Sequence, residues 1–195
     1  MSCDPAATLF IFDWDDTLLP SHWLGERNLF KDEYNDFSDE EKVQIDNVSN
    51  SVQAVLQHAQ KYGKVIIITN SDSGWVALSC ARYMPACVSL LETIKVLSAR
   101  ALFETMYGDD PIDWKTVAFQ QEGLSFTNVI SIGDSECERM ALKSIAGPGR
   151  FTKSLKIVEC SDTVHIAAQL DLVTTLMEMI VAHKHSIDVC CYEAR

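Results

Sequence analysis

The sequence predicts an α/β fold in which a doubly wound parallel sheet is covered by helices on both faces. Short β-branched and apolar runs alternate with segments of helical periodicity along the chain, which is typical of strand–helix–strand units. The middles of several runs, such as residues 65–68, are apolar throughout, as expected for strands that are buried on both faces. A length of 195 residues without an internal repeat or a low-complexity linker favours a single domain.

The apolar runs and the helical periodicities place the individual elements. Strands are expected at 8–13, 64–70, 93–99, 128–134 and 155–160. Helices are expected over 45–59, from about 73 onward, and over 110–119, 135–145 and 162–180. The third of these helices begins with Asp110 and Pro111, an N-cap followed by a first-turn proline. The last is expected to be capped by Asp162 or Ser161.

Two segments do not follow this pattern. Residues 18–38 contain Pro20, Gly25 and several aromatic side chains without a clear period, and we interpret them as a flap on a single domain of residues 1–185. Residues 186–195 are expected to form a C-terminal tail. The stretch 32–46 carries seven acidic residues and one lysine, and is either a solvated loop with an acidic first helical turn or a surface for a partner.

The composition disfavours several classes of protein. Sixteen Lys and Arg residues against 28 Asp and Glu residues give a net charge of −12, so binding to nucleic acid or to an anionic membrane surface is not expected. The apolar runs are too short to cross a bilayer, and no signal peptide is recognisable. The seven cysteines include no C-x-x-C pair, so reduced thiols and a cytoplasmic location are expected.

Polar side chains follow three of the predicted strands. Asp13 and Asp15 follow the first strand, Thr69 the second and Asp134 the fourth. In an open parallel sheet, ligands bind beyond the carboxyl ends of the strands, near the point where the strand order reverses. If these strands are neighbours, three carboxylates and a hydroxyl meet there, and such hard oxygen ligands suit Mg²⁺. The helix start at 70–74 offers free backbone N–H groups for a phosphate.

Three motifs in this order resemble the haloacid dehalogenase (HAD)-like hydrolase superfamily. FDWDDTLLPS matches the D-x-D-x-T motif of the family, VIIITN matches its strand that ends in a threonine, and IGDSECE matches its G-D-x-x-x-[DE] motif. The resemblance covers nearly the whole chain and is greatest to small members with a D-W-D-D-T-L-L start and a W-K-x-x-A-F segment. It implies a Rossmann-like sheet with the strand order 5-4-1-2-3, in which the first strand is central.

The resemblance also implies roles for the acidic residues. Asp13 is the nucleophile that forms an aspartyl-phosphate, and Asp15 is the general acid and then the general base. Mg²⁺ is held by the carboxylates of Asp13 and Asp134 and by the backbone carbonyl of Asp15. Glu138 and Thr17 are expected behind the metal ligands, where Glu138 holds a metal-bound water or orients Asp134.

A phosphate-binding site is implied in the same way. Thr69 and Asn70, at the end of the second strand, bind phosphoryl oxygens. A lysine completes the site, because phosphoryl transfer depends on positioning and on neutralising charge. Lys115, near a predicted helix start, is favoured for this role, with Lys143 and Lys153 as the alternatives.

The residues distinguish between the reactions known in the family. Dehalogenases lack the acid/base aspartate that stands here as Asp15, and transport ATPases carry D-K-T-G-T and membrane helices. Phosphomutases work under a cap domain, and residues 18–38 are too few to fold as one. The expected protein is therefore a capless, Mg²⁺-dependent phosphatase (a phosphomonoester hydrolase). Its phosphorylated substrate is either a phosphoprotein or a small metabolite, and in the second case a homo-oligomer could close the site.

The alternative is a catalytically weak binding or regulatory protein with the same fold. The acidic segment 23–46 also carries Trp23, Phe30, Tyr34 and Phe37, which could form a surface for a partner. Against this alternative, the nucleophile, the acid/base aspartate and the second-motif threonine are all present, whereas a protein that has lost activity is expected to lose them.

Overall fold

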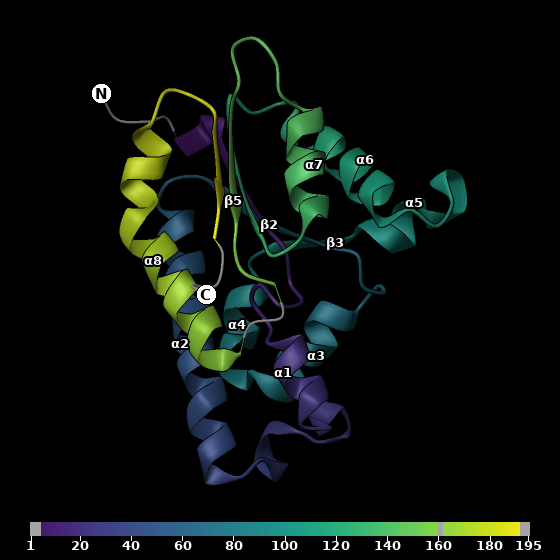
Figure 1. The fold of residues 1–195 in the computed structure, drawn as a ribbon, viewed down its shortest axis with the longest axis vertical. Coiled ribbons are helices and arrows are strands. Elements are labelled where there is room, and N and C mark those ends of the chain that lie inside the picture. Colours follow the sequence, from purple (N-terminus) through teal and green to yellow (C-terminus); the bar gives the residue numbers. More distant parts are fainter. Residues whose placement is uncertain (1–4, 160–161, 192–195) are drawn as a thin grey trace.

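Six parallel strands form one sheet in the computed structural model, which describes residues 5–159 and 162–191 (Figure 1). The sheet order is β3-β2-β1-β4-β5-β6. The strands are β1 Thr8–Phe12, β2 Lys64–Thr69, β3 Lys95–Ser98, β4 Asn128–Gly133, β5 Phe151–Lys156 and β6 Ile187–Cys190. The predicted α/β class with a parallel sheet is confirmed, and a sixth strand extends the sheet beyond the five expected.

The strand order reverses at β1. The chain runs from β1 outward through β2 to β3, and it then returns to place β4 on the other side of β1. Phe12 of β1 stands in register with Ile67 of β2 and with Ile132 of β4, so the three buried strands end at the same edge of the sheet. This edge is where a parallel α/β sheet binds its ligands.

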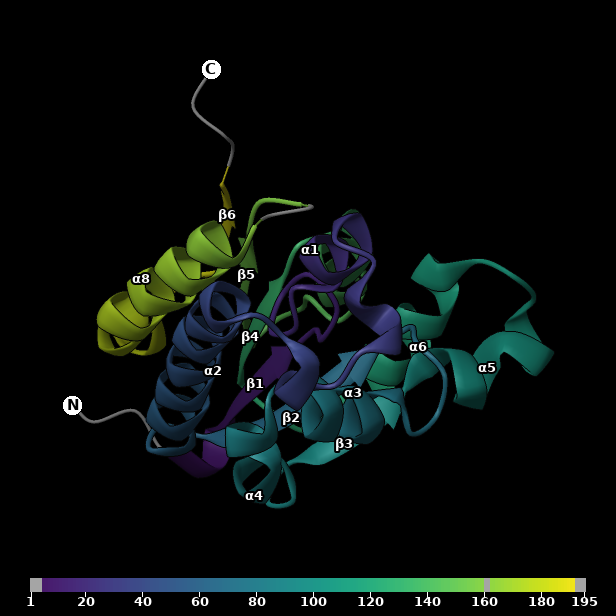
Figure 2. The same ribbon diagram turned by 90° about the horizontal axis from the view of Figure 1, so that it is seen from below.

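Helices cover both faces of the sheet (Figures 1 and 2). One face packs against α2 Asp39–Gln60, α3 Trp75–Tyr83, α4 Val88–Leu91 and α8 Thr163–Ala182. The other packs against α5 Ala99–Tyr107, α6 Pro111–Gly123 and α7 Glu136–Ser144. Because side chains alternate along a strand, Phe10 and Phe12 enter the first core, whereas Leu9 and Ile11 enter the second.

Several helix starts use the side-chain caps that the sequence indicates. The carboxylate of Asp110 accepts a hydrogen bond from the Ile112 N–H, and Pro111 follows it as predicted. Asp162 caps α8 by accepting from the His165 N–H, while Ser161, the alternative cap, lies outside the described residues. These caps satisfy N–H groups that have no partner inside the helix.

The fifth strand lies earlier in the chain than predicted. It spans Phe151–Lys156 rather than 155–160, and residue 160 lies outside the described residues. Thr152 and Ser154 are polar but buried, so an apolar-run criterion misses this strand. Pairing with β4 over its whole length places the strand where it is.

The predicted C-terminal tail is wrong for residues 187–190. Ile187–Cys190 form β6, which pairs with β5, and residues 192–195 lie outside the described part of the chain. Residues from other elements hold the strand in place. Arg139 of α7 donates to Asp188 at 2.8 Å, and Ser186 accepts from the Thr152 N–H of β5 at 3.0 Å. Only the edge of β5 makes this short segment a strand.

The segment 18–38 packs more closely than its sequence suggests. It contains α1 Ser21–Glu26 and 3-10 turns at Leu29–Lys31 and Tyr34–Asp36. Trp23 and Phe37 are buried, and Phe37 stacks on Tyr83 of α3 with ring centroids 6.3 Å apart. The interpretation of these two aromatic residues as an exposed surface is therefore wrong, whereas Phe30 is exposed.

One element meets the length and composition expected of a membrane-spanning helix. Within the described residues this is α8, although the sequence had shown no run long enough for a span. The core helices of soluble proteins can have the same length and composition, so these two properties alone do not distinguish a core helix from a membrane-spanning helix. Here Ile166, Leu170 and Met177 of α8 are fully buried in the core that α8 forms with α2 and the sheet.

Candidate functional site

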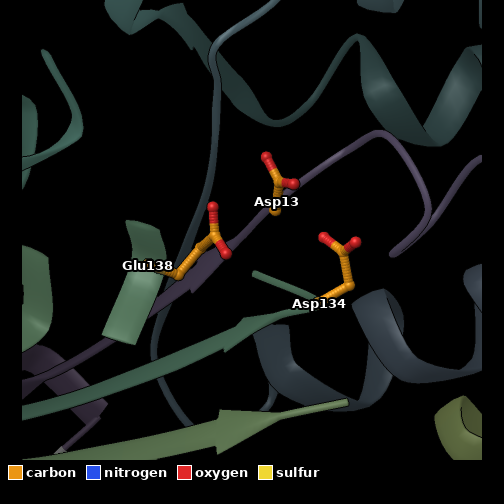
Figure 3. A group of neighbouring side chains, drawn as sticks. All are labelled: Asp13, Asp134 and Glu138. Atoms are coloured by element: carbon orange, nitrogen blue, oxygen red, sulfur yellow. The ribbon is translucent and has the colours of Figure 1, made fainter. Parts of the chain in front are cut away.

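Two carboxylates meet at the carboxyl edge of the central strands. Asp13 directly follows β1, and its N–H donates to the Ile132 carbonyl of β4 at 2.9 Å. Asp134 directly follows β4. Oxygens of Asp13, Asp134 and Glu138 of α7 all lie within 4.8 Å of one another, and Figure 3 shows the three side chains converging on one space. The adjacency of β1 and β4 thus brings together residues 121 positions apart (134 − 13).

A buried lysine binds two of these carboxylates. Lys115 of α6 is only 2% exposed, and its Nζ donates to Asp13 Oδ1 at 2.7 Å and to Glu138 Oε1. The other two candidate lysines lie elsewhere. Lys143 lies 3.5 Å from Asp188, and Lys153 is buried with its Nζ donating to the Ile180 and Val181 carbonyls of α8. Among the three, the geometry therefore selects Lys115.

Glu138 is held from two sides. Its Oε2 accepts from the Ser135 N–H at 3.0 Å and from the Ser135 hydroxyl at 2.6 Å, which forms the capping box at the start of α7. Its Oε1 accepts from Lys115. The Ser-x-x-Glu spacing of residues 135 and 138 is the sequence signal of this capping box. Glu138 has an oxygen within 4.8 Å of oxygens of Asp13 and Asp134, and its expected place behind the metal ligands stays a prediction.

Asp15 faces a different set of partners. Its Oδ1 accepts from the Ser21 hydroxyl at 2.5 Å and from the Trp75 indole N–H at 2.9 Å, and its Oδ2 accepts from the Ser71 hydroxyl at 2.6 Å. No sequence signal points to these three donors, since they come from α1, from the loop after β2 and from α3. They hold the Asp15 carboxylate in one orientation.

Thr17 and the loop after β1 complete this region. The Trp14 carbonyl accepts from the N–H groups of Leu18 and Leu19, which folds the chain back immediately after the strand. Asp16 has a φ of 53°, a left-handed conformation that aspartate tolerates better than most residues. The turn brings the Thr17 hydroxyl to 3.5 Å from Asp134 Oδ1, and the role of Thr17 behind the metal ligands stays a prediction.

Thr69 and Asn70, at the end of β2, have no hydrogen bond to the carboxylate cluster within the described structure. Thr69 shares the strand face of Val65 and Ile67, opposite the face that carries Asp13, and its hydroxyl accepts from the Ser71 N–H at 3.0 Å. Asn70 donates to the Pro111 carbonyl at 3.3 Å, and its buried Oδ1 has no hydrogen-bond partner among the described residues.

The charges of the cluster are not balanced. Three carboxylates face one ammonium, which leaves two negative charges uncompensated when all four groups are ionised. Burial raises the pKa of Asp13, and the charges of Glu138 and Asp134 raise it further against the opposing effect of Lys115. Burial, together with the charge of Glu138, raises the pKa of Asp134 to about 7.

In Glu138 and Lys115 the pKa shifts favour the charged forms. Burial alone would raise the pKa of Glu138, but the charge and the hydrogen bond of Lys115 outweigh this and lower it. Burial alone would lower the pKa of Lys115, but the charges of Asp13 and Glu138 outweigh this and raise it. Lys115 and Glu138 therefore form a charged pair, and the excess negative charge lies on the side of Asp13 and Asp134.

Gly133 allows Glu138 to lie close to the end of β4. A Cβ added at residue 133 would lie 2.5 Å from the Glu138 Cγ and 2.7 Å from Oε2. Since Lys115 and Ser135 hold Glu138, it has little freedom to move away. We expect Gly133→Ala to lower the free energy of unfolding by about 1–3 kcal/mol, measured by urea denaturation. Gly147→Ala, where an added Cβ meets no atom within 4 Å, is the matched control and should change it by less than about 0.5 kcal/mol. Equal effects of the two substitutions would contradict this account.

The cluster combines a shielded carboxylate, a fixed ammonium and additional oxygen donors at the ligand-binding edge of the sheet. Such a set can bind a divalent cation through oxygen, and it can place a carboxylate nucleophile beside a neutralising charge. A scan against protein-family models, a search of the curated proteins and a search of the solved structures found no significant match to this chain. A functional proposal therefore depends on the motifs and on the geometry of the cluster.

Proposed function

We propose that this protein is a Mg²⁺-dependent phosphomonoester hydrolase of the HAD-like type that works through an aspartyl-phosphate on Asp13. The observation that carries the proposal is the buried cluster in which the Lys115 ammonium bonds Asp13 and Glu138 while Asp134 lies beside them. Asp13 and Asp134 come from motif positions directly after β1 and β4, Glu138 comes from α7, and Lys115 comes from α6. Phosphoryl transfer depends mainly on positioning the reacting groups and on neutralising negative charge, and this cluster of side chains can do both.

The donor set fits Mg²⁺. The ion prefers one or two carboxylates, together with water and substrate oxygens, and the cluster offers carboxylates with two uncompensated negative charges. Asp13 and Asp134 would hold the ion with the backbone carbonyl of Asp15, while Thr17 orients Asp134. When bound, the ion supplies positive charge that draws the phosphoryl group toward Asp13 and polarises it.

The first step transfers the phosphoryl group to the protein. A carboxylate oxygen of Asp13 attacks phosphorus, and the bond between phosphorus and the leaving oxygen breaks. Asp15 donates its proton to that oxygen, which leaves as an alcohol. Lys115 keeps Asp13 in place and offsets the negative charge that gathers on the phosphoryl oxygens.

The second step removes the phosphoryl group with water. Asp15, now a carboxylate, takes a proton from a water molecule while the water oxygen attacks phosphorus. The bond between phosphorus and Asp13 breaks, inorganic phosphate leaves, and both carboxyl groups return to their starting states. Ser21, Ser71 and Trp75 keep Asp15 in the orientation that both proton transfers need.

Hydrolysis of p-nitrophenyl phosphate tests the proposal directly. We expect turnover with Mg²⁺ that is lost in excess EDTA and restored by added Mg²⁺. The measurement is the release of p-nitrophenol. A metal-independent background equal to that of the Asp13→Asn protein would contradict the proposal. That result would favour the alternative, a regulatory protein that acts through segment 23–46, whose acidic residues Asp39 and Glu40 remain exposed.

Metal binding is expected to be visible without turnover. A ligand that binds only the folded protein stabilises it by about 2.7 kcal/mol at a concentration of 100 Kd, which corresponds to a rise in Tm of about 5–10 °C for a chain of this size. We expect this rise with Mg²⁺ and its loss in Asp134→Ala. Asp171→Ala, which removes an exposed carboxylate from α8, is the control and should keep the rise. An unchanged response of Asp134→Ala to Mg²⁺ would place the metal elsewhere.

A further inference from the structure

Strand β6 leaves one edge of the sheet open. It is last in the sheet order, and none of the described strands pairs with its outer side. The Cys191 N–H donates to the Lys156 carbonyl of β5 at 2.8 Å, so the backbone groups of residues 187, 189 and 191 point toward β5. Successive residues of a strand alternate in this direction, so the N–H and C=O groups of Asp188 and Cys190 point outward. These groups are available to a further strand.

The open edge lacks two common protections against pairing. Edge strands often carry lysine or proline, which discourage the approach of another strand. The opposite edge strand, β3, begins with Lys95, whereas β6 contains neither residue type. The one charged side chain of β6, Asp188, accepts from Arg139 at 2.8 Å and lies 3.5 Å from the Lys143 Nζ. Another strand therefore meets no uncompensated charge at this edge.

Apolar side chains continue this edge onto the neighbouring helix. Leu172, Leu176 and Met179 stand at i, i+4 and i+7 on one face of α8, and we call them, together with Val189 of β6, the apolar strip. Leu172, Leu176 and Val189 line one groove, in which Gln169 is the only polar residue among the described lining residues. Figure 2 shows α8 and β6 together at the outer side of the sheet. An exposed apolar surface of this kind marks an interaction site.

We propose that two copies of this chain join at β6 in an antiparallel, two-fold symmetric pairing with Val189 opposite the partner's Val189. In this register Asp188 faces the partner's Cys190, and Cys190 faces the partner's Asp188. Each of these two pairs exchanges two backbone hydrogen bonds, so all the outward groups of both strands are used. The register with Asp188 opposite the partner's Asp188 would instead place like charges against each other.

The same symmetry brings the two helices together. Val189 shares the strand face of Ile187, which packs against the core that includes α8. A two-fold axis normal to the sheet keeps both α8 helices on this face, so the two apolar strips meet across the axis. The inference goes beyond the proposed function and does not depend on it, because β4 and β5 lie between β6 and the strand that precedes Asp13.

Charge favours a second copy over the other partners of an apolar surface. Around β6, Arg139 and Lys143 are paired with Glu136 and Asp188, so two copies of a chain with a net charge of −12 can meet here without contact between like charges. A lipid surface could cover the apolar strip, but lipid tails cannot bond the outward backbone groups of β6. The net charge also disfavours an anionic membrane.

Sedimentation of the full chain in reducing buffer tests the assembly at about 1–100 μM, a range that covers the dissociation constants of specific dimers. We expect a dimer whose fraction rises with concentration. Val189→Lys should give a monomer, because two ammonium groups would meet on the axis. Val96→Lys is the matched control, since it places the same charge on the other edge strand at a valine of similar exposure (39% against 45%), and it should leave the dimer intact.

Two further variants test the helix. Leu172→Lys places a charge within the apolar strip and should raise the dissociation constant about tenfold or more. Val164→Lys places it at an exposed position of α8 that lines the groove toward α2, and it should leave the dissociation constant unchanged. Thermal melting of each variant shows whether it is folded.

A cysteine pair tests the register. In a chain that carries Cys190→Ser and Cys191→Ser, Val189→Cys should form an intermolecular disulfide when oxidised glutathione is added. The Cα atoms of such a directly opposed, non-hydrogen-bonded pair lie about 4.5 Å apart, which a disulfide can span. Val96→Cys in the same chain is the control and should not be linked.

Several results would overturn the inference. These are a monomer at every concentration, a dimer that persists in Val189→Lys, and a dimer that Val189→Cys does not link. A monomer that binds phosphatidylcholine vesicles, and loses this binding in Leu172→Lys, would assign the apolar strip to a lipid surface instead. A monomer that becomes a dimer when residues 192–195 are removed would show that these residues occupy the edge. If Val189→Lys does not fold, the disulfide decides.

Discussion

Asp13→Asn is expected to reduce the hydrolysis of phosphate esters to background, because the substitution removes the nucleophile of the proposed reaction. Loss of a covalent nucleophile costs about 10⁴–10⁶-fold in kcat. An amide has almost the same shape as a carboxylate but does not attack phosphorus, so the first step stops and no phosphoenzyme forms. The measurement is the release of phosphate from p-nitrophenyl phosphate with saturating Mg²⁺.

The folded structure is expected to tolerate this substitution. Lys115 keeps its bond to Glu138, and the amide oxygen at residue 13 can still accept from its Nζ. Asp16→Asn is the matched control three residues away, since asparagine also tolerates the left-handed φ of 53° and can accept from the His22 N–H in place of Asp16 Oδ1. This control should retain most of the activity. Wild-type turnover in Asp13→Asn would show that another residue is the nucleophile.

Asp15→Asn is expected to trap the intermediate rather than to prevent its formation. p-Nitrophenol is a good leaving group and needs little protonation, so the first step survives in part. Hydrolysis of the aspartyl-phosphate still requires a proton to be taken from water, and general-base help contributes about 10²–10⁴-fold. The second step therefore slows more than the first, and phosphoenzyme accumulates.

The position of residue 15 makes this substitution informative. With the amide oxygen in the place of Oδ1, it can still accept from the Ser21 hydroxyl and the Trp75 indole N–H, and the Ser71 hydroxyl can rotate to accept from the amide NH₂ in the place of Oδ2. The side chain therefore keeps its place while losing the ability to carry a proton. Mass spectrometry should find about 80 Da added at Asp13, the mass of HPO₃ in the covalent intermediate. Phosphate at Asp15 or at a serine, or turnover at the wild-type rate, would rule out this division of roles.

The apolar strands could be placed from the sequence because their burial depends on their own residues. In β1, β2 and β4 the runs are apolar on both faces, and the helices between them carry periodic apolar positions. Asp110 and Pro111 marked the start of α6 correctly, since an N-cap is a local interaction. These features follow from nearest neighbours along the chain.

Elements that depend on distant partners could not be placed in this way. β5 has polar side chains that become buried only between β4 and β6, and β6 is a strand only because the edge of β5 accepts it. Trp23 and Phe37 looked exposed in an irregular segment, but the core of α2 and α3 covers them. In each case the burial comes from residues far along the chain.

The candidate site divides along the same line. Asp13, Asp15 and Asp134 could be expected together because the carboxyl ends of neighbouring parallel strands share one edge, whereas Glu138 entered through the motif resemblance. The sequence favoured Lys115 but kept Lys143 and Lys153 as alternatives, and only the tertiary structure shows which of the three bonds Asp13, since this depends on how α6 packs against the sheet.

The sequence by itself determined the α/β class, the central apolar strands and the positions of the acidic residues, because these are recorded in local periodicity and in short motifs. The tertiary structure decided which lysine bonds the carboxylates and which donors hold Asp15. These features depend on distances between side chains from separate elements. Such distances are set by the packing of the whole chain rather than by any one segment of it.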